Sequence, residues 1–218
     1  MIFQAAVVFA LQAAAAQPAL NTTPTPWPDP ERELRNAGAM DSANSPEARI
    51  MMARLAACVV DESPAKVADV LARDFRTTSY RNGLRNLMRS NDGCSRKARL
   101  RGTIRMEELP FAAALAETML GRDAKPLNAR LAMAAAGPEA PTYSPSDTIA
   151  MCVARSAPDD VAALLGSEPG YPSEIEALGR VEKVARACSG GRKLEISPIG
   201  LRSIVATASY RLLASPKT

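Results

Sequence analysis

Residues 56–71 read AACVVDESPAKVADVL, and residues 150–165 read AMCVARSAPDDVAALL. The second stretch lies 94 residues after the first and keeps its pattern of apolar positions, with cysteine third and proline ninth. We interpret the chain as an internal duplication of one small module. The positions matched by the shift are Ala56, Cys58, Val59, Pro64, Val67, Ala68, Leu71, Leu84, Cys94, Ser95 and Leu100, which fall on Ala150, Cys152, Val153, Pro158, Val161, Ala162, Leu165, Leu178, Cys188, Ser189 and Leu194.

The four cysteines allow three disulfide pairings. The duplication favours Cys58–Cys94 and Cys152–Cys188, because each ancestral module then carries its own bond. No cysteine lies in a C-x-x-C arrangement, so a redox-active dithiol is not expected. The alternative is that the four cysteines are buried and reduced.

The first residues are apolar, and no charged side chain occurs before Asp29. Small residues at Ala14 and Ala16 fit a signal-peptidase site, so residues 1–16 are predicted to be a signal peptide. This start lacks the usual Lys or Arg, which leaves a membrane anchor or a misassigned start codon as alternatives. Arg far outnumbers Lys and Ala is abundant, which favours a GC-rich bacterial genome. A periplasmic or secreted protein is therefore expected, with no membrane span after residue 16.

The predicted organisation is all-α, with two tandem four-helix modules. Residues 17–45 are rich in proline and are expected to form a flexible linker. The first module spans 46–121 and the second 145–218, and we keep these two names below. Residues 122–144 are the linker between them, with a helical stretch near 126–136 and a break at 137–141.

In the first module, Ser45-Pro46 and Ser63-Pro64 predict two helix starts, since Ser favours the N-cap and Pro the first helical position. A third helix is expected over 79–90, ending before Cys94, and a fourth over 106–120. A short extended segment is possible after the second cysteine, near 100–104.

In the second module, Ser146 or Asp147 is expected to cap the first helix, and Pro158 and Pro172 to open the next two. The third helix should reach Cys188, and the fourth should run from 198 to 213. A short extended segment near 194–196 would match the one in the first module.

The chain contains no histidine. This excludes Ser-His-Asp and Cys-His catalysis and metal sites built on imidazole. The adjacent pairs Asp61-Glu62 and Asp159-Asp160 would be needed for a carboxylate-dependent hydrolase, but neighbouring residues do not face each other on a helix. No catalytic residue, metal site or cofactor is expected.

The charge of the first module is uneven. Residues 73–105 contain ten basic and two acidic residues, whereas the matching residues 167–199 are balanced. Arg81, Arg85 and Arg89 follow at i, i+4 and i+8, so they share one helix face, and guanidinium groups bind anions well. The candidate anion-binding residues are Arg81, Arg85, Arg89, Arg96, Lys97, Arg99 and Arg101. The alternative is a solvated face, or neutralisation by the second module's Glu168, Glu174, Glu176, Glu182 and Glu195.

Three classes of function remain. The first is an exported, non-enzymatic binding or structural protein of the envelope or medium, acting through protein contacts. The second is an anion-binding module that recognises lipid headgroups, acidic polysaccharide or nucleic acid. The third, with least support from the residues, is the carboxylate-dependent hydrolase. The expected partner is an anionic envelope component or another protein.

Overall fold

The computed structural model describes residues 45–98, 108–191 and 194–215. Every regular element in these ranges is an α-helix, so the expected all-α fold is confirmed for the described part of the chain. The predicted signal peptide and the linker up to residue 44 lie outside it. The helices are α2 (Pro46–Glu62), α3 (Pro64–Leu71), α4 (Thr78–Ser90), α5 (Asp92–Lys97), α6 (Glu108–Leu120), α7 (Leu127–Ala135), α8 (Pro145–Ser156), α9 (Pro158–Leu165), α10 (Pro172–Cys188) and α11 (Pro198–Ala214).

Several helix boundaries recur 94 residues along the chain. Helix α9 begins and ends 94 residues after α3, α10 begins 94 residues after α4, and α11 ends 94 residues after α6. The backbone between the first two helices of each module also agrees, with φ −143° and ψ 49° at Ser63 against φ −136° and ψ 58° at Ala157. The local geometry thus follows the shift that relates the two stretches of sequence.

Ser-Pro pairs open three of the long helices. The hydroxyl of Ser45 accepts from the amide of Ala48 at 3.2 Å, and Ser197 accepts from Gly200 at 3.0 Å. The second module's first helix was expected to be capped by Ser146 or Asp147, and this was wrong. Ser144 caps it instead, because Pro145 takes the first helical position, and the Asp147 side chain is buried.

Both expected disulfides are present. Cys58–Cys94 joins α2 to α5, with 5.6 Å between the Cα atoms, and Cys152–Cys188 joins α8 to the last residue of α10, with 5.9 Å. Each bond therefore connects the first helix of a module to the region where its third helix ends.

The expectation of four helices per module was wrong for the first module. The chain turns at Asn91 and forms the extra helix α5, which contains Cys94. The side-chain nitrogen of Asn91 donates to the carbonyl of Leu87, and its side-chain oxygen accepts from Ser63. These bonds hold the turn at Asn91, whereas α10 of the second module continues as one helix to Cys188. Residues 194–197 form no strand, and the other expected extended segment lies in the undescribed 99–107.

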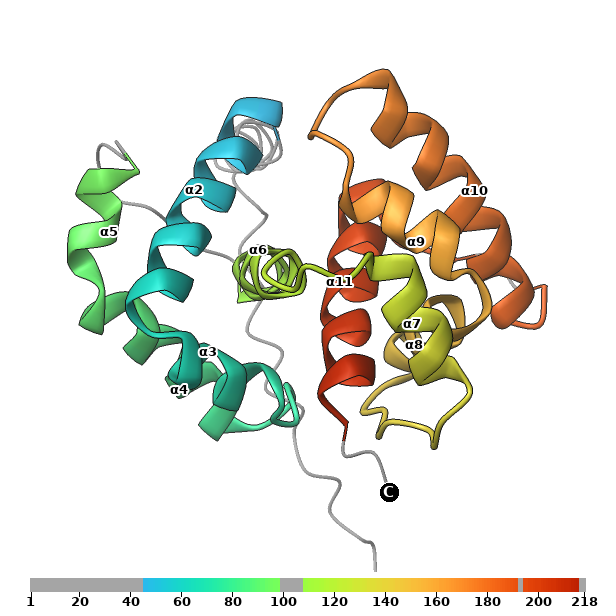
Figure 1. Cartoon of the computed structure of the whole chain (residues 1–218), viewed down its shortest axis with the longest axis horizontal. Coiled ribbons are helices and arrows are strands. Elements are labelled where there is room, and N and C mark those ends of the chain that lie inside the picture. The colour runs from blue at the N-terminus through green and yellow to red at the C-terminus, as the bar shows by residue number, and fades with distance from the viewer. Residues whose placement is uncertain (1–44, 99–107, 192–193, 216–218) are drawn as a thin grey trace, which may run out of the picture. The chain divides into compact units, whose positions relative to one another are not determined.

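Two apolar clusters form the core. One is built mainly by α2 to α6, and the other by α7 to α11. Helix α7, within the predicted inter-module linker, packs with the second cluster through Leu131. Helix α6 lies between α2 and α11 (Figure 1).

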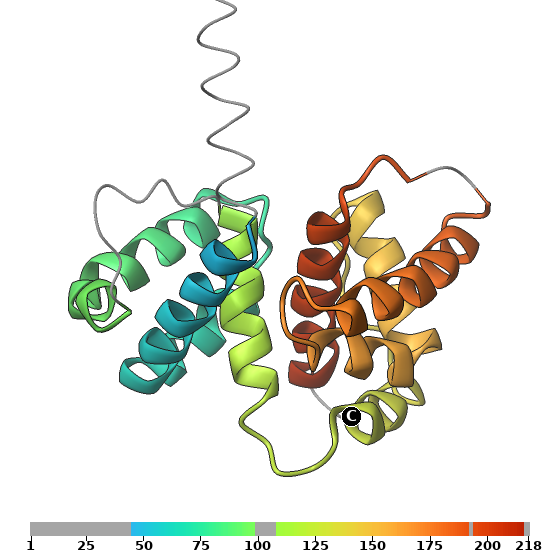
Figure 2. The same cartoon turned by 90° about the horizontal axis from the view of Figure 1, so that it is seen from above.

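Helices α6 and α11 make the most extensive helix–helix contact in the described part of the chain, and they lie side by side in both views (Figure 2). The two helices cross, since α6 is seen end-on and α11 lengthwise in Figure 1, and Glu117 near the end of α6 bonds Arg202 near the start of α11. Ala113 and Ala206 are both buried near the middle of the pair. Small side chains there allow the two backbones to approach closely.

Breaking either disulfide should lower the free energy of unfolding by about 2–4 kcal/mol, because each cysteine pair spans 36 residues of chain and its loss returns entropy to the unfolded state. The paired variants Cys58→Ala/Cys94→Ala and Cys152→Ala/Cys188→Ala can be compared with the parent by urea unfolding. Equal unfolding midpoints with and without reductant would contradict the presence of these bonds.

Candidate functional site

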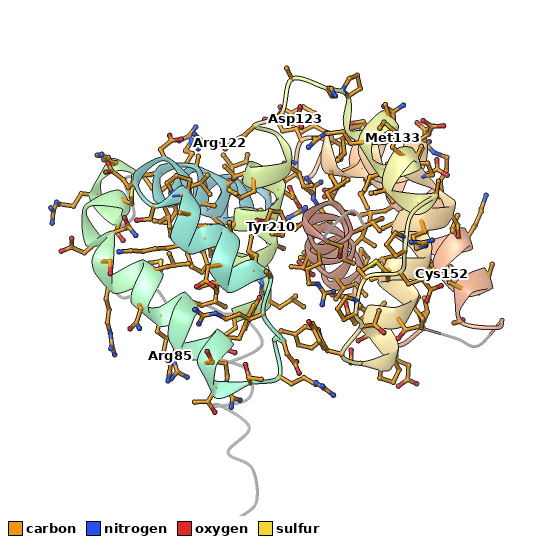
Figure 3. The ribbon with its side chains drawn as sticks, turned by 60° about the horizontal axis from the view of Figure 1, so that its bottom comes forward. Arg85, Arg122, Asp123, Met133, Cys152 and Tyr210 are labelled. Carbon is orange, nitrogen blue, oxygen red and sulfur yellow. A yellow bond between two sulfur atoms is a disulfide. The ribbon has the colours of Figure 1, made fainter. Side chains whose placement is uncertain are left out.

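Helix α4 presents the predicted arginines to solvent. Its buried residues are Tyr80, Leu84 and Leu87, and Arg81, Arg85 and Arg89 are exposed on the remaining surface. We call these three residues the arginine face. Figure 3 shows Arg85 at the periphery, pointing away from the helices.

The arginine face has few carboxylate partners within the described residues. Arg81 and Arg89 form no ion pair there, and Arg85 lies 3.6 Å from a Glu108 oxygen. The Arg85 and Glu108 side chains are 59% and 42% exposed, so this ion pair contributes little to stability. The positive charge of the face is therefore largely open to solvent.

The other predicted anion-binding residues are only partly grouped with this face. Arg96 and Lys97 lie on α5 and are exposed, and Lys97 pairs with Glu62 of α2 at 2.7 Å. Arg99 and Arg101 lie outside the described residues. Among the predicted residues that the structure describes, Arg81, Arg85 and Arg89 form the one set on a single helix face.

The second module's glutamates do not neutralise the arginine face. Glu176 and Glu182 pair with Arg180 and Arg186 on their own helix, each at 2.8 Å. Glu174 is buried and engages Arg202 and Arg49. Glu168 and Glu195 are exposed and form no ion pair within the described part of the chain. The alternative explanation by mutual neutralisation is therefore wrong for Arg81, Arg85 and Arg89.

A buried ion cluster at one end of the α6–α11 pair was not predicted. The Arg202 guanidinium donates to both carboxylate oxygens of Glu117, at 2.9 and 2.8 Å, and to Glu174 at 2.8 Å. Glu174 also accepts from Arg49 of α2, at 2.9 Å through one nitrogen. These four residues, which we call the closed cluster, join α2, α6, α10 and α11.

The loop before α10 completes the closed cluster. The amide of Gly170 donates to Glu174 at 2.7 Å. Gly170 has a φ of 83°, and a Cβ there would lie 2.5 Å from Cγ of Pro46, so this position requires glycine. Burial by itself would raise the pKa of Glu174, but the bonds from Arg49 and Gly170 and the charge of Arg202 outweigh it and lower that pKa to about 2.

A second buried pair lies near the opposite end of the α6–α11 pair. Arg211 of α11 binds both carboxylate oxygens of Asp147, one of them at 3.0 Å. Its guanidinium lies 5.2 Å from the ring centre of Tyr143 and 5.7 Å from that of Phe75. The two rings meet edge to face at 5.8 Å, and such rings attract cations.

A pocket of about 210 Å³ opens beside Arg211. Its polar groups include Tyr80, Glu108, Asp147 and Arg211, and we call it the α6–α11 pocket. Burial raises the pKa of Tyr80 to about 12, with Arg211 opposing the rise and Glu108 adding to it, so this hydroxyl stays protonated. Its apolar walls include Leu71, Phe75, Leu109 and Ile204.

The sequence did contain a signal for these buried pairs. The two arginines of α11, Arg202 and Arg211, are the only charged residues in an otherwise largely apolar helix, and both are buried. Arginine is almost never buried unless it is paired. The pattern could therefore have indicated buried partners, but not which carboxylates supply them.

Within the described ranges, no group of three or more histidine, cysteine or acidic residues is placed to hold a metal ion. No helix among the described residues is both long and apolar enough to cross a membrane. Neither a protein-family model, a curated protein nor a solved structure matches the chain.

Acidification should destabilise the protein through Glu174. A carboxyl group whose pKa is lower in the folded than in the unfolded state stabilises the fold at pH values above its unfolded pKa. For Glu174 this stabilisation is lost as the pH falls from about 4.5 to about 2. We expect a loss of roughly 2–3 kcal/mol across this window, measured as the free energy of unfolding at several pH values.

The variant Glu174→Gln should be about 3 kcal/mol less stable at neutral pH, because Arg49 and Arg202 lose the carboxylate they share, and its stability should depend less on acid. Glu176→Gln is the matched control, since that side chain is 78% exposed and pairs only within α10. Equal acid sensitivity in both variants would rule out Glu174 as the source.

Proposed function

We propose that the chain is an exported, non-enzymatic binding protein of the periplasm or medium, and that the arginine face of α4 binds a multiply charged anion. The observation that supports this most directly is the exposure of Arg81, Arg85 and Arg89, whose one ion pair within the described residues is the long, exposed one between Arg85 and Glu108. Export is supported by the two disulfides, which persist in oxidising compartments.

We also propose that the two modules arose by duplication. The cysteine spacing, the helix boundaries 94 residues apart and the similar backbone angles at Ser63 and Ala157 support this origin. In this view the arginine face is a divergent feature of the first module, because the positions 94 residues after Arg81, Arg85 and Arg89 are Ile175, Gly179 and Lys183.

The spacing of the arginine face suits an array of anions more than a single one. Successive arginines lie four residues apart, which corresponds to about 6 Å along a helix, so the face extends about 12 Å from Arg81 to Arg89. Each guanidinium can bind a phosphate, sulfate or carboxylate through two nitrogens. Lipid headgroups at a membrane surface and acidic polysaccharides both present charges in this way.

A second candidate is binding to another protein through α10. Tyr171 and Ile175, at the start of this helix, are 54% and 68% exposed. Ile175 borders a groove of about 510 Å³ whose apolar lining includes Leu178, Leu194 and Ile196. Exposed apolar side chains beside a groove favour contact with apolar side chains of a partner. Such binding would depend weakly on salt and would be lost in Ile175→Ser.

The variant Arg81→Gln/Arg85→Gln/Arg89→Gln should bind anionic surfaces about 100-fold more weakly, because each basic residue near such a surface contributes about 1 kcal/mol. Binding of the chain from residue 17 onward to phosphatidylglycerol–phosphatidylcholine vesicles and to heparin can be measured across a salt series. We expect parent binding to weaken steeply with salt.

The matched control is Arg122→Gln/Lys125→Gln/Lys183→Gln, which removes the same charge from exposed positions outside α4. Arg122 lies well apart from Arg85 in Figure 3. If both triple variants lose affinity equally, net charge and not the arginine face determines binding. If neither probe binds the parent, the arginine face is solvated surface and α10 becomes the surface to test.

A further inference from the structure

The two ends of the α6–α11 pair are built from related positions. Glu117 and Arg202 meet at the closed cluster. The position 94 residues after Glu117 is Arg211, and the position 94 residues before Arg202 is Glu108. Arg211 and Glu108 both line the α6–α11 pocket, at the other end of the same pair of helices. The pocket and the closed cluster therefore occupy corresponding places in the fold.

Charge is balanced at the closed cluster. Two guanidinium groups, of Arg49 and Arg202, face two carboxylates, of Glu117 and Glu174. The position 94 residues after Arg49 is Tyr143, and the position 94 residues before Glu174 is Tyr80. Tyr80, which lines the pocket, thus stands where the closed cluster has a carboxylate. Tyr143, whose ring centre lies 5.2 Å from the Arg211 guanidinium, stands where the closed cluster has a cation.

The charged groups at the pocket differ in how closely they are paired. Arg211 forms an ion pair with Asp147 and donates to both of its carboxylate oxygens. Arg73 pairs with Asp69, and Arg76 with Asp74. This leaves Glu108, whose one ion pair within the described residues is the long, exposed one with Arg85. Among the carboxylates that line the pocket, Glu108 therefore has the longest and most exposed ion pair.

The pocket also offers a hydrogen-bonding group without a partner. Tyr80 is buried, it lines the pocket, and its hydroxyl forms no hydrogen bond with any described residue. A phenolic hydroxyl both donates and accepts, so it can accept from an ammonium or guanidinium group. Phe75, Leu71, Leu109 and Ile204 supply apolar surface next to it.

We propose that the α6–α11 pocket binds a small organic cation, an amine or guanidine attached to an aromatic or short aliphatic body. The cationic group pairs with Glu108 and bonds the Tyr80 hydroxyl, and the body packs against Leu109 and Ile204. The volume of about 210 Å³ suits a ligand of one ring, since a dry protein cavity of about 150 Å³ holds benzene. This site differs from the proposed anion site on the arginine face, and the two are linked by the ion pair between Glu108 and Arg85.

The test uses three probes of nearly equal size and different charge, benzylamine, benzyl alcohol and benzoate, titrated into the chain from residue 17 onward. Binding is followed by isothermal calorimetry and by amide chemical shifts in two-dimensional NMR spectra. We expect benzylamine to bind most tightly, with shifts that include Tyr80, Leu109 and Ile204. Equal affinity for the three probes, preference for benzoate, or no binding of benzylamine would overturn the proposal.

Two variants test which residues of the pocket bind the cationic group of the ligand. Glu108→Gln should weaken benzylamine binding about tenfold, and Tyr80→Phe a few-fold, while Glu176→Gln, exposed on α10, should leave it unchanged. Glu108 is partly exposed and is not a core residue, so its variant is expected to fold. Unchanged affinity in Glu108→Gln would show that the pocket does not use this carboxylate.

The variant Arg85→Gln separates this proposal from the anion-binding one. It removes the cation that competes for Glu108, so benzylamine should bind several-fold more tightly, whereas heparin should bind more weakly. Weaker benzylamine binding in this variant would contradict the assignment of Glu108. Failure of heparin binding alone would leave the pocket proposal standing.

Discussion

The contact between α6 and α11 is the interaction on which the rest of the structure depends. Ala113 and Ala206 are small and buried, so the two helices approach closely at the middle of the pair. One apolar cluster packs on α6 and the other on α11, and both arginines of α11 are buried at its ends. The position of every group at the closed cluster and at the pocket therefore follows from how these two helices cross.

The same contact explains a difference in charge between the two modules. Position 117 of α6 faces position 202 of α11, which is 94 residues after 108. If α11 carried acidic residues at the positions where α6 does, Glu117 would face another glutamate in a partly buried place, and like charges there are costly. Instead α6 carries Glu108 and Glu117, and α11 carries Arg202 and Arg211. This reversal gives the pair one preferred arrangement within a single chain.

Features set by local sequence were predictable, and those set by tertiary contacts were not. The disulfides followed from the cysteine spacing. The starts of α2, α3, α9, α10 and α11 followed from a proline at the first helical position, a signal that acts within a few residues. The turn at Asn91 depends on Ser63, between α2 and α3, and the closed cluster joins residues up to 125 apart, so neither has a local signature. The exposure of the arginine face was predictable from periodicity, but the structure was needed to show that, within the described residues, it makes one ion pair, from Arg85 to Glu108.

The closed cluster and the pocket show how the same pair of helices can form internal ion pairs at one end and a pocket open to a ligand at the other. Arg49 lies in the first turn of α2 and belongs to the closed cluster. Tyr143, at the corresponding position, precedes α8, because α8 begins five residues later than a 94-residue shift of α2 would place it. The second module therefore supplies no helical arginine at that position, and Glu108 remains near the surface with Arg85. Because Arg85 belongs also to the arginine face, an anion that binds Arg85 competes with Glu108 for the same guanidinium. The two proposed sites are thus joined by one side chain, and the fold places them next to each other without requiring that either be catalytic.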